Sequence, residues 1–242
     1  QYLHLTHEET QRLIKENTHN VDLIIPRGGE NLIRFVKENS TIPTIISGRG
    51  NNFLYVDKKC DFDMAVRIIL NGKKRISVCN ALDKVLIDEN LPNIQDKIAQ
   101  LVSALKNKGI EVLGNSSVCS LNSEITENND EKVLGEEFLA PKIYLTLVPD
   151  ITAAIRLINT YSGKHSATIV TNEFSQANRF MQEVDCAAVY HNASTRFTDG
   201  GEFGLGAEIA ISTQKLHFRG PIGAEQLVTN KWFVYGNGHI RE

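Results

Sequence analysis

The strongest constraint on the fold is the alternation of short apolar runs with helical segments along the chain. A first apolar run, residues 21–26, ends in a proline and a glycine-rich loop, and a helical stretch at 32–39 and a second apolar run at 43–48 follow it. A strand, a loop, a helix and a strand within about 25 residues form the pattern of a βαβ unit. Continuous short apolar runs favour strands of a parallel sheet that are buried on both faces. We therefore predict an α/β fold with a doubly wound sheet.

The same alternation continues through the middle of the chain. We expect strands at 53–56, 85–87, 110–113, 142–148, 167–170 and 187–191, and helices at 61–70, 93–108, 152–160 and 175–183. Residues 116–131 are polar and poor in apolar side chains, which predicts a surface loop. Near the N-terminus, Thr6 and Glu9 have the spacing of a capping box and predict a short helix.

Composition and charge exclude several classes of function. The chain has 242 residues, 41% of them hydrophobic and 23% charged, as in ordinary globular proteins. Its net charge of −3 gives no support for binding to nucleic acid or to an anionic membrane. No apolar run approaches the roughly 18 residues that span a bilayer. We expect a cytoplasmic protein without nucleic-acid or membrane partners, and no metal site, because the HxxH of His4 and His7 has no further ligand cluster.

The cysteines supply one candidate nucleophile. Their number is too small for a disulfide scaffold, and no two have CxxC spacing. Cys79 follows the basic segment 73–75, and neighbouring positive charge lowers the pKa of a thiol and so favours the reactive thiolate. The alternative, which the sequence leaves open, is that Cys79 is a small buried hydrophobic residue.

Glycines near the second apolar run are candidates for ligand binding. Gly48 and Gly50 could let backbone amides approach a phosphate or a nicotinamide. A tight turn without a ligand explains them equally well. The chain has no GxGxxG motif, so the intrinsic dinucleotide signal is weak.

A polar loop follows the expected strand at 187–191. Because α/β proteins place ligands at the carboxyl ends of their strands, this loop is a candidate substrate site. Its amide, hydroxyl and guanidinium groups would suit an amino-acid substrate, with the arginine holding a carboxylate in a bidentate fork. The residues are Asn192, Ser194, Thr195 and Arg196. The alternative is a solvated turn with Arg196 on the surface.

Three segments together carry a resemblance to a known family. They are DLIIPRGGE at 22–30, SVCNAL at 77–82 and NASTRFTDGGEFGLGAEIAISTQKLHFRGPIGAEQL at 192–227. In this order they resemble the γ-glutamyl phosphate reductase family of the aldehyde dehydrogenase superfamily, over essentially the whole chain. The resemblance implies an aldehyde-dehydrogenase-like three-layer α/β/α fold. The chain opens with Gln rather than Met, and we expect it to be the C-terminal portion of a longer protein.

The resemblance also implies a domain organisation. Residues 1–53 would be the end of a Rossmann-type cofactor-binding domain, and residues 54–225 would be the catalytic domain. Residues 226–242 would be a tail that serves oligomerisation or packing between domains. We expect a homo-oligomer.

The family's chemistry would place its catalytic cysteine at Cys79. The implied reaction is NADPH-dependent reduction of L-glutamyl 5-phosphate, a small-molecule substrate, to L-glutamate 5-semialdehyde through a thioester. Glu137 would hold the nicotinamide ribose, with Glu136 as the second choice. The segment before Cys79 departs from the family pattern, since it is one residue shorter and lacks a proline.

Three other interpretations remain. One is a catalytically inactive fragment or degraded paralogue that lacks the main NADP domain. A hydrolytic aldehyde dehydrogenase is opposed by residues 45–48, which lack the glutamate that would activate water. A pure nucleotide-binding module is opposed by Cys79 and the polar loop.

Overall fold

The centre of the computed structural model is a seven-stranded sheet in which every neighbouring pair of strands is parallel. The structure describes residues 2–242, apart from the side chain of Glu30, so Gln1, where the predicted cofactor segment begins, lies outside the described residues. The strand order is β4-β3-β5-β2-β1-β6-β7. The strands are β1 (Asn52–Val56), β2 (Leu82–Asp88), β3 (Glu111–Gly114), β4 (Thr126–Glu127), β5 (Lys142–Val148), β6 (Ser166–Val170) and β7 (Ala188–His191).

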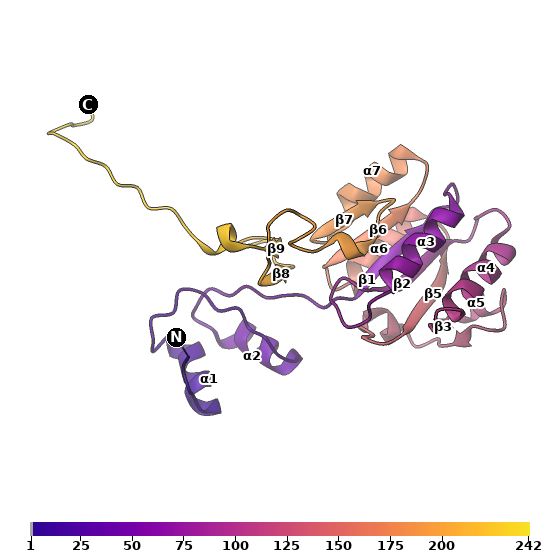
Figure 1. The fold of residues 1–242 in the computed structure, drawn as a ribbon, viewed down its shortest axis with the longest axis horizontal. Coiled ribbons are helices and arrows are strands. Elements are labelled where there is room, and N and C mark those ends of the chain that lie inside the picture. Colours follow the sequence, from indigo (N-terminus) through magenta and orange to yellow (C-terminus); the bar gives the residue numbers. More distant parts are fainter. Residues whose placement is uncertain (1) are drawn as a thin grey trace.

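Helices cover both faces of this sheet (Figure 1). Three of them, α3 (Phe62–Gly72), α4 (Ile94–Lys106) and α5 (Ser116–Cys119), share one apolar core with Leu54 and Val85. The other two, α6 (Ile151–Tyr161) and α7 (Phe174–Glu183), share a second core with Tyr55 and Leu86. Neighbouring residues of one strand thus enter opposite cores, as the alternation of side chains along a strand requires. The predicted three-layer α/β/α fold is confirmed.

The helix starts follow from capping residues in the sequence. Asp61 Oδ1 accepts a hydrogen bond from the backbone N–H of Met64 at 2.9 Å, and Asp150 Oδ1 accepts one from Ala153 at 2.9 Å. Such caps satisfy backbone donors that have no partner within the helix. The capping box of Thr6 opens α1 (His7–Glu16) as predicted.

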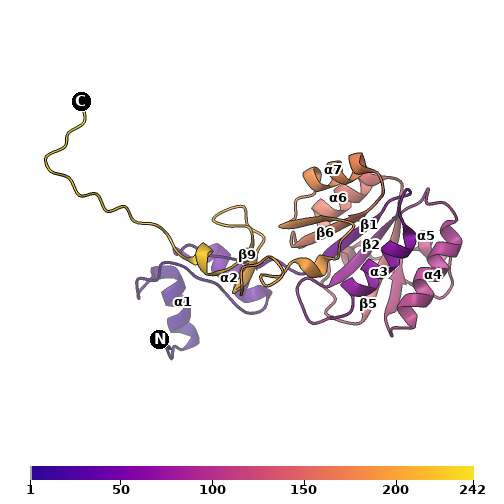
Figure 2. The ribbon, with the colours of Figure 1, turned by 45° about the horizontal axis from the view of Figure 1, so that its top comes forward.

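A smaller unit lies apart from the large sheet. Figures 1 and 2 both show α1 and α2 (Glu30–Asn39) away from the three layers, close to the hairpin of β8 (Ala210–Ser212) and β9 (Gly220–Ile222). Ile45 is buried in a small core with Ala210 and Ile222. A late segment of the chain therefore packs against an early one.

The two apolar runs that flank α2 form less sheet than predicted. They meet in a single parallel bridge between Ile24 and Thr44, which is the βαβ direction that the sequence indicated. They do not extend into the strands that we predicted. The reason is that the second run turns to β8, through an antiparallel bridge between Ser47 and Ser212, instead of lying between two sheet neighbours.

The predicted surface loop at 116–131 is also wrong in part. It contains α5 and β4 and the first residue of η1, a 3-10 helix (Glu131–Gly135). Val118 and Ile125 are buried in the core, so two apolar residues in a polar stretch fix this segment against the sheet.

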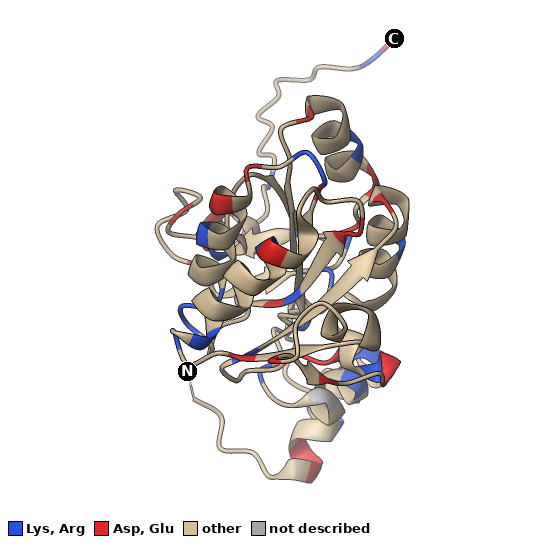
Figure 3. Cartoon of the chain, turned by 90° about the vertical axis from the view of Figure 1, so that its right-hand side faces the viewer, with Lys and Arg blue, Asp and Glu red and all other residues tan. Residues whose placement is uncertain are grey.

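The C-terminal residues 228–242 extend away from both units, beyond η3 (Ala224–Leu227) (Figure 1). Their aromatic side chains Trp232, Phe233 and Tyr235 are exposed. None of the helices among residues 2–242 combines the length and apolarity that crossing a bilayer requires. Figure 3 shows lysine and arginine positions mixed with acidic positions along the chain.

Candidate active site

The candidate site lies at the amino-terminal edge of the parallel sheet. Gly50 shortly precedes β1, Cys79 precedes β2, and Glu137 precedes β5. Because these three strands are parallel neighbours, their amino ends meet at one edge. From the sequence we placed the polar substrate loop at the carboxyl ends of the strands, after β7, and Cys79 ahead of the strand expected at 85–87. The nucleophile candidate stands on a loop that enters a strand, not on one that leaves it.

A cavity of about 1060 Å³ opens beside this edge. Residues of both the large unit and the smaller unit line this cavity. From the large unit come Cys79, Glu137 and Leu139; from the smaller unit come Pro26 to Gly29, residues of α2, Ile46 to Arg49, and Glu208 to Ile211.

Asn52 fixes the loop that carries Cys79. This buried side chain donates from Nδ2 to the backbone oxygens of Gly50 at 3.0 Å, Cys79 at 2.8 Å and Ala81 at 2.7 Å. Its Oδ1 accepts from the backbone N–H of Ser166 at 3.0 Å. Sequence reasoning missed Asn52, although a polar residue at the start of a fully buried strand was the available signal.

Gly50 lets the cysteine loop and Glu137 come close together. A Cβ at this position would lie 2.2 Å from the backbone oxygen of Cys79 and 2.6 Å from Glu137 Oε1. Gly48 lines the cavity, and its own Cβ would lie 2.5 Å from the backbone oxygen of Gly163. Packing within the protein therefore accounts for both glycines, and their role in cofactor binding stays a prediction.

The segment that carries Glu137 is held by a buried charged network. Asp83 is at its centre: Oδ1 accepts from Lys73 Nζ at 2.5 Å, and Oδ2 accepts from the backbone N–H of Phe138 at 2.8 Å. Lys84 Nζ donates to the backbone oxygen of Glu136 at 2.8 Å. The side chains of Lys73, Asp83 and Lys84 are all buried. We call these three residues the Lys73–Asp83–Lys84 network.

Burial governs the protonation of the groups around this network. It lowers the pKa of Lys84 to about 7, and the nearby Asp83 carboxylate opposes that shift. Burial also raises the pKa of Glu137, while the backbone N–H of Gly50 acts in the opposite direction. Glu137 lines the cavity with Cys79, whereas Glu136 supplies its backbone oxygen to Lys84. Of the two glutamates proposed from the sequence, Glu137 is the one beside the cysteine.

The electrostatic setting of Cys79 differs from the prediction. Desolvation by surrounding protein is the largest cause that raises the pKa of its thiol, and the carboxylates of Glu208 and Glu137 raise it further. The basic flank does not lower this pKa, because Lys73 is paired with Asp83 while Lys74 and Arg75 line a different cavity. Cys79 is nevertheless solvent-exposed, whereas Cys186 is buried and Cys60 and Cys119 are partly buried.

The polar loop after β7 runs from the carboxyl ends of the strands back to their amino ends. Asn192 stays at the carboxyl edge, where its Oδ1 accepts from the backbone N–H of Thr171 and its Nδ2 donates to the backbone oxygen of Thr171, both at 3.0 Å. Four or five residues of extended chain span about 15 Å, which is enough to reach the amino edge. The loop ends there in η2 (Thr195–Phe197).

At the amino edge this loop clamps Asn80, the residue after Cys79. Thr195 Oγ1 donates to the backbone oxygen of Asn80 at 2.8 Å, and Asn80 Nδ2 donates to the backbone oxygen of Thr198 at 3.0 Å. Ser194 Oγ accepts from the backbone N–H of Arg196 at 3.3 Å. The side chains of Asn192, Ser194 and Thr195 thus form hydrogen bonds to backbone groups of the protein.

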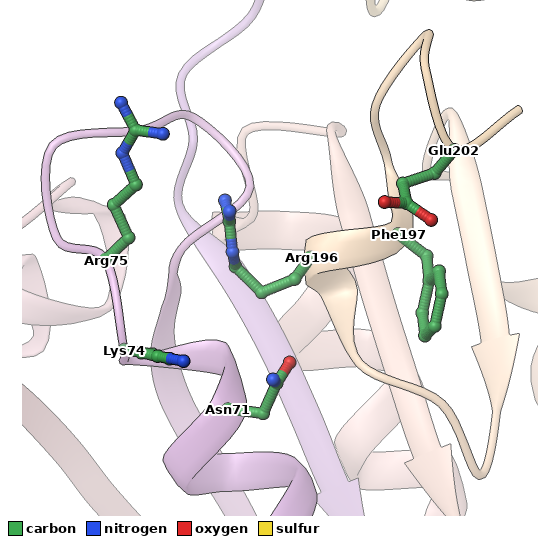
Figure 4. A pocket seen from close by; sticks show the side chains of 6 residues that line it. All are labelled: Asn71, Lys74, Arg75, Arg196, Phe197 and Glu202. Carbon is green, nitrogen blue, oxygen red and sulfur yellow. The ribbon is translucent and has the colours of Figure 1, made fainter.

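Arg196 lines a second cavity of about 530 Å³. Its Nη1 donates to Asn80 Oδ1, so the guanidinium is tied to the residue that follows the cysteine. Figure 4 shows the side chains that line this cavity, with Arg196 placed between Arg75 and Glu202 in that view. The six lining residues are Asn71, Lys74, Arg75, Arg196, Phe197 and Glu202.

Comparison with known proteins connects this arrangement to a family. Residues 92–206 match the model of the aldehyde dehydrogenase family. Over these residues, a little under half of the chain, it is similar to aldehyde dehydrogenases. Among residues 2–242, no group of three or more His, Cys, Asp or Glu side chains could hold a metal ion.

The relatives at higher identity share one name. The chain is 49% identical to the γ-glutamyl phosphate reductase of Clostridium botulinum over 222 residues, which are 91% of this chain and 53% of the relative. It is 45% identical to that of Clostridium perfringens over 242 residues, which are 100% of this chain and 58% of the relative. The chain therefore spans a little over half the length of these relatives, and it matches their C-terminal portion.

Solved structures have the same fold. The crystal structure of γ-glutamyl phosphate reductase from Thermotoga maritima superposes with a TM-score of 0.91 at 39% identity, over 98% of this chain and 56% of that one. An acetylating aldehyde dehydrogenase from Geobacillus thermoglucosidasius reaches a TM-score of 0.70 at 17% identity, over 98% of this chain and 61% of that one, and shows the fold alone.

Proposed function

We propose that the protein containing this chain reduces L-glutamyl 5-phosphate to L-glutamate 5-semialdehyde, releases phosphate, and uses NADPH as the reductant. The observation that carries this proposal is the position of Cys79. It is an exposed cysteine on a loop fixed by Asn52, and it lines a cavity together with Glu137. The names of the relatives support the substrate assignment.

The residues around the larger cavity fit a nicotinamide nucleotide. Gly29 precedes α2 with no side-chain cap, so the amide donors at the start of this helix are available to an anion. Arg27, Arg34 and Lys37 line the same cavity and would complement phosphate groups. Glu137 would accept hydrogen bonds from the nicotinamide ribose, and Gly48 and Gly50 would form the wall behind the ring. The cavity thus has cations at one part and the carboxylates of Glu137 and Glu208 near the thiol.

The mechanism assigns the covalent step to Cys79. Its thiolate attacks the acyl carbon of the substrate, a C–S bond forms, and the C–O bond to phosphate breaks with its electron pair leaving on phosphate. Bound NADPH would supply the hydride that reduces the resulting thioester. The C–S bond then breaks, the aldehyde leaves, and the thiolate of Cys79 is regenerated. The backbone N–H of Cys79 would stabilise the negative oxygen, and one such donor contributes about 10²–10³ in rate.

The polar loop would hold the other end of the substrate. Arg196 would bind the α-carboxylate, and Asn192, Ser194 and Thr195 would position that end. The described side-chain bonds indicate that these three act through the backbone that they hold: Thr195 fixes Asn80, Ser194 caps η2, and Asn192 anchors the start of the loop at Thr171.

The proposed domain roles, oligomeric state and cellular location rest on the resemblance to the family. Residues 1–53 would close a cofactor-binding domain, residues 54–225 would be the catalytic domain, and residues 226–242 would take part in homo-oligomerisation or domain packing in a cytoplasmic enzyme. The exposed aromatic side chains of the tail support a role in packing.

Phosphate-dependent oxidation of L-glutamate 5-semialdehyde by the full-length gene product tests the proposal. We expect NADP reduction by the wild type, and a loss of at least about 10³-fold in the Cys79→Ala variant, because no other group would form the thioester. Cys119→Ala, at a partly buried cysteine elsewhere, is the matched control and should keep its activity. Turnover by Cys79→Ala near the wild-type rate would overturn the mechanism, and an inactive wild type would favour the interpretation as a degraded paralogue.

A further inference from the structure

The second cavity carries both signs of charge at the end of the Arg196 loop. We propose that it binds the α-amino acid end of the substrate as a zwitterion, with Glu202 accepting the α-ammonium group and Lys74 joining Arg196 at the α-carboxylate. This inference rests on the proposed function, and it adds Glu202 and Lys74 as residues that determine specificity.

The lining matches such a ligand group by group. Lys74, Arg75 and Arg196 supply positive charge on one side, and Glu202 supplies the single carboxylate among the lining residues. In Figure 4 the Lys74 ammonium points towards the space below Arg196, and Glu202 lies on the other side of Arg196 from Arg75 in that view. Phe197, which is 48% exposed, offers an apolar surface to the methylene chain of an amino acid. Asn71 adds an amide to the same wall.

The charges in this cavity are not neutralised by one another. Among the described residues, the ion pairs of the chain involve neither Arg196 nor Glu202, and Arg196 instead bonds to the neutral side chain of Asn80. A guanidinium with one nitrogen held by Asn80 keeps its other donors for a carboxylate, which it can bind in a planar fork.

The position of the cavity relative to Cys79 fits the substrate. The α-carbon of a γ-glutamyl group lies a short methylene chain away from the acyl carbon that Cys79 attacks. Arg196 is tied to Asn80, the next residue after Cys79, while Cys79 itself lines the larger cavity, so the two cavities are connected through adjacent residues of one loop. The lining carries both signs of charge, and a group with a carboxylate and an ammonium can use both, whereas a phosphate would leave the carboxylate of Glu202 without a partner.

Two aldehydes that differ in the α-ammonium group test the role of Glu202. The full-length gene product is assayed in the oxidative direction with L-glutamate 5-semialdehyde and with 5-oxopentanoate, which keeps the carboxylate and lacks the amine. We expect Glu202→Gln to lower kcat/KM for the first about tenfold, the effect of one charge-assisted hydrogen bond, and to leave the second unchanged. Lys74→Met should lower kcat/KM for both aldehydes, because both carry the carboxylate.

Glu89→Gln is the matched control, since Glu89 is exposed just beyond the carboxyl end of β2, away from the amino edge. This variant should leave kcat/KM unchanged for both aldehydes. Equal losses with both aldehydes in Glu202→Gln, or no loss with either, would overturn the ammonium assignment. A loss in Lys74→Met confined to the aminated substrate would overturn the carboxylate assignment.

A binding measurement separates this inference from the proposed reaction. If the wild type catalyses no reduction, calorimetry with L-glutamate and with glutarate still examines the cavity. Tighter binding of L-glutamate than of glutarate in the wild type, with the difference lost in Glu202→Gln, would support the zwitterion site. An unchanged preference in Glu202→Gln, or no preference in the wild type, would refute it whether or not the protein is a reductase.

Discussion

Asp83→Asn tests the buried network that holds Glu137 beside Cys79. Lys73 Nζ and Asp83 Oδ1 are 2.5 Å apart, and the two side chains are 0% and 2% exposed. At an effective dielectric constant of about 20, opposite unit charges at this distance attract by roughly 6–7 kcal/mol, most of which offsets their desolvation. The variant keeps the shape of the side chain but leaves the Lys73 ammonium buried without a counter-charge. We expect a loss of about 3–5 kcal/mol in the free energy of unfolding.

Urea unfolding followed by far-UV circular dichroism measures this loss. Fluorescence is less suitable, because Trp232 is 84% exposed in the extended tail. With a slope of about 2–3 kcal/mol per molar urea, the midpoint should fall by roughly 1–2 M. Lys59→Met is the control, since it breaks an exposed pair with Glu173, and it should change the free energy of unfolding by less than about 1 kcal/mol.

An apolar replacement of the pair checks the reasoning. The double variant Lys73→Met with Asp83→Leu leaves no buried charge from this pair and should recover much of the stability lost in Asp83→Asn. Its Phe138 amide still loses an acceptor, so about 1 kcal/mol should remain missing. A loss below about 1 kcal/mol in Asp83→Asn, or a double variant less stable than Asp83→Asn, would refute the claim that a buried ion pair holds this segment.

Three further predictions concern titration and cofactor binding. Glu208→Gln should lower the pKa of the Cys79 thiol, because Glu208 is the carboxylate with the largest electrostatic effect on that thiol. Alkylation of Cys79 by iodoacetamide at neutral pH should therefore become faster. The control Glu89→Gln should leave the alkylation rate unchanged. Burial lowers the pKa of Lys84 to about 7, so above that pH the unfolded chain binds more protons than the folded chain. The free energy of unfolding should therefore rise by about 1 kcal/mol per pH unit towards pH 9. Urea midpoints measured against pH should show this rise in the wild type and lack it in Lys84→Met. The 242-residue chain alone should bind NADPH more weakly than about −8 kcal/mol by calorimetry, because its sequence contains no GxGxxG segment between a strand and a helix; low-micromolar binding would contradict this.

The elements of the large unit could be predicted because local pattern and packing agree there. A fully buried run such as β1 is typical of a central strand, and an aspartate such as Asp61 marks the start of its helix. The smaller unit was predicted less well, because its two apolar runs depend on β8, more than 160 residues later in the chain. Periodicity reports which face of an element is buried, but not which distant segment covers it.

The structure brings the predicted residues Cys79 and Glu137 to one cavity, and their roles stay predictions. The sequence did not show that the amino ends of β1, β2 and β5 meet there, because the rule for ligand sites in α/β sheets describes loops that leave strands. Asn52 and Glu208 were missed for another reason. Each acts through a contact between segments far apart in sequence, and no local spacing reports such a contact.

The charges around Cys79 connect its reactivity to the arrangement of the two units. Glu208 raises the pKa of the thiol and Arg27 lowers it, and both residues belong to the smaller unit, while Cys79 belongs to the large one. Coulomb interactions across a partly desolvated cavity depend strongly on distance. A shift of the smaller unit that brings Arg27 closer than Glu208 therefore increases the thiolate fraction, and the reverse shift decreases it. A charged ligand that lies between Arg27 and Cys79 is therefore expected to change the pKa of the Cys79 thiol.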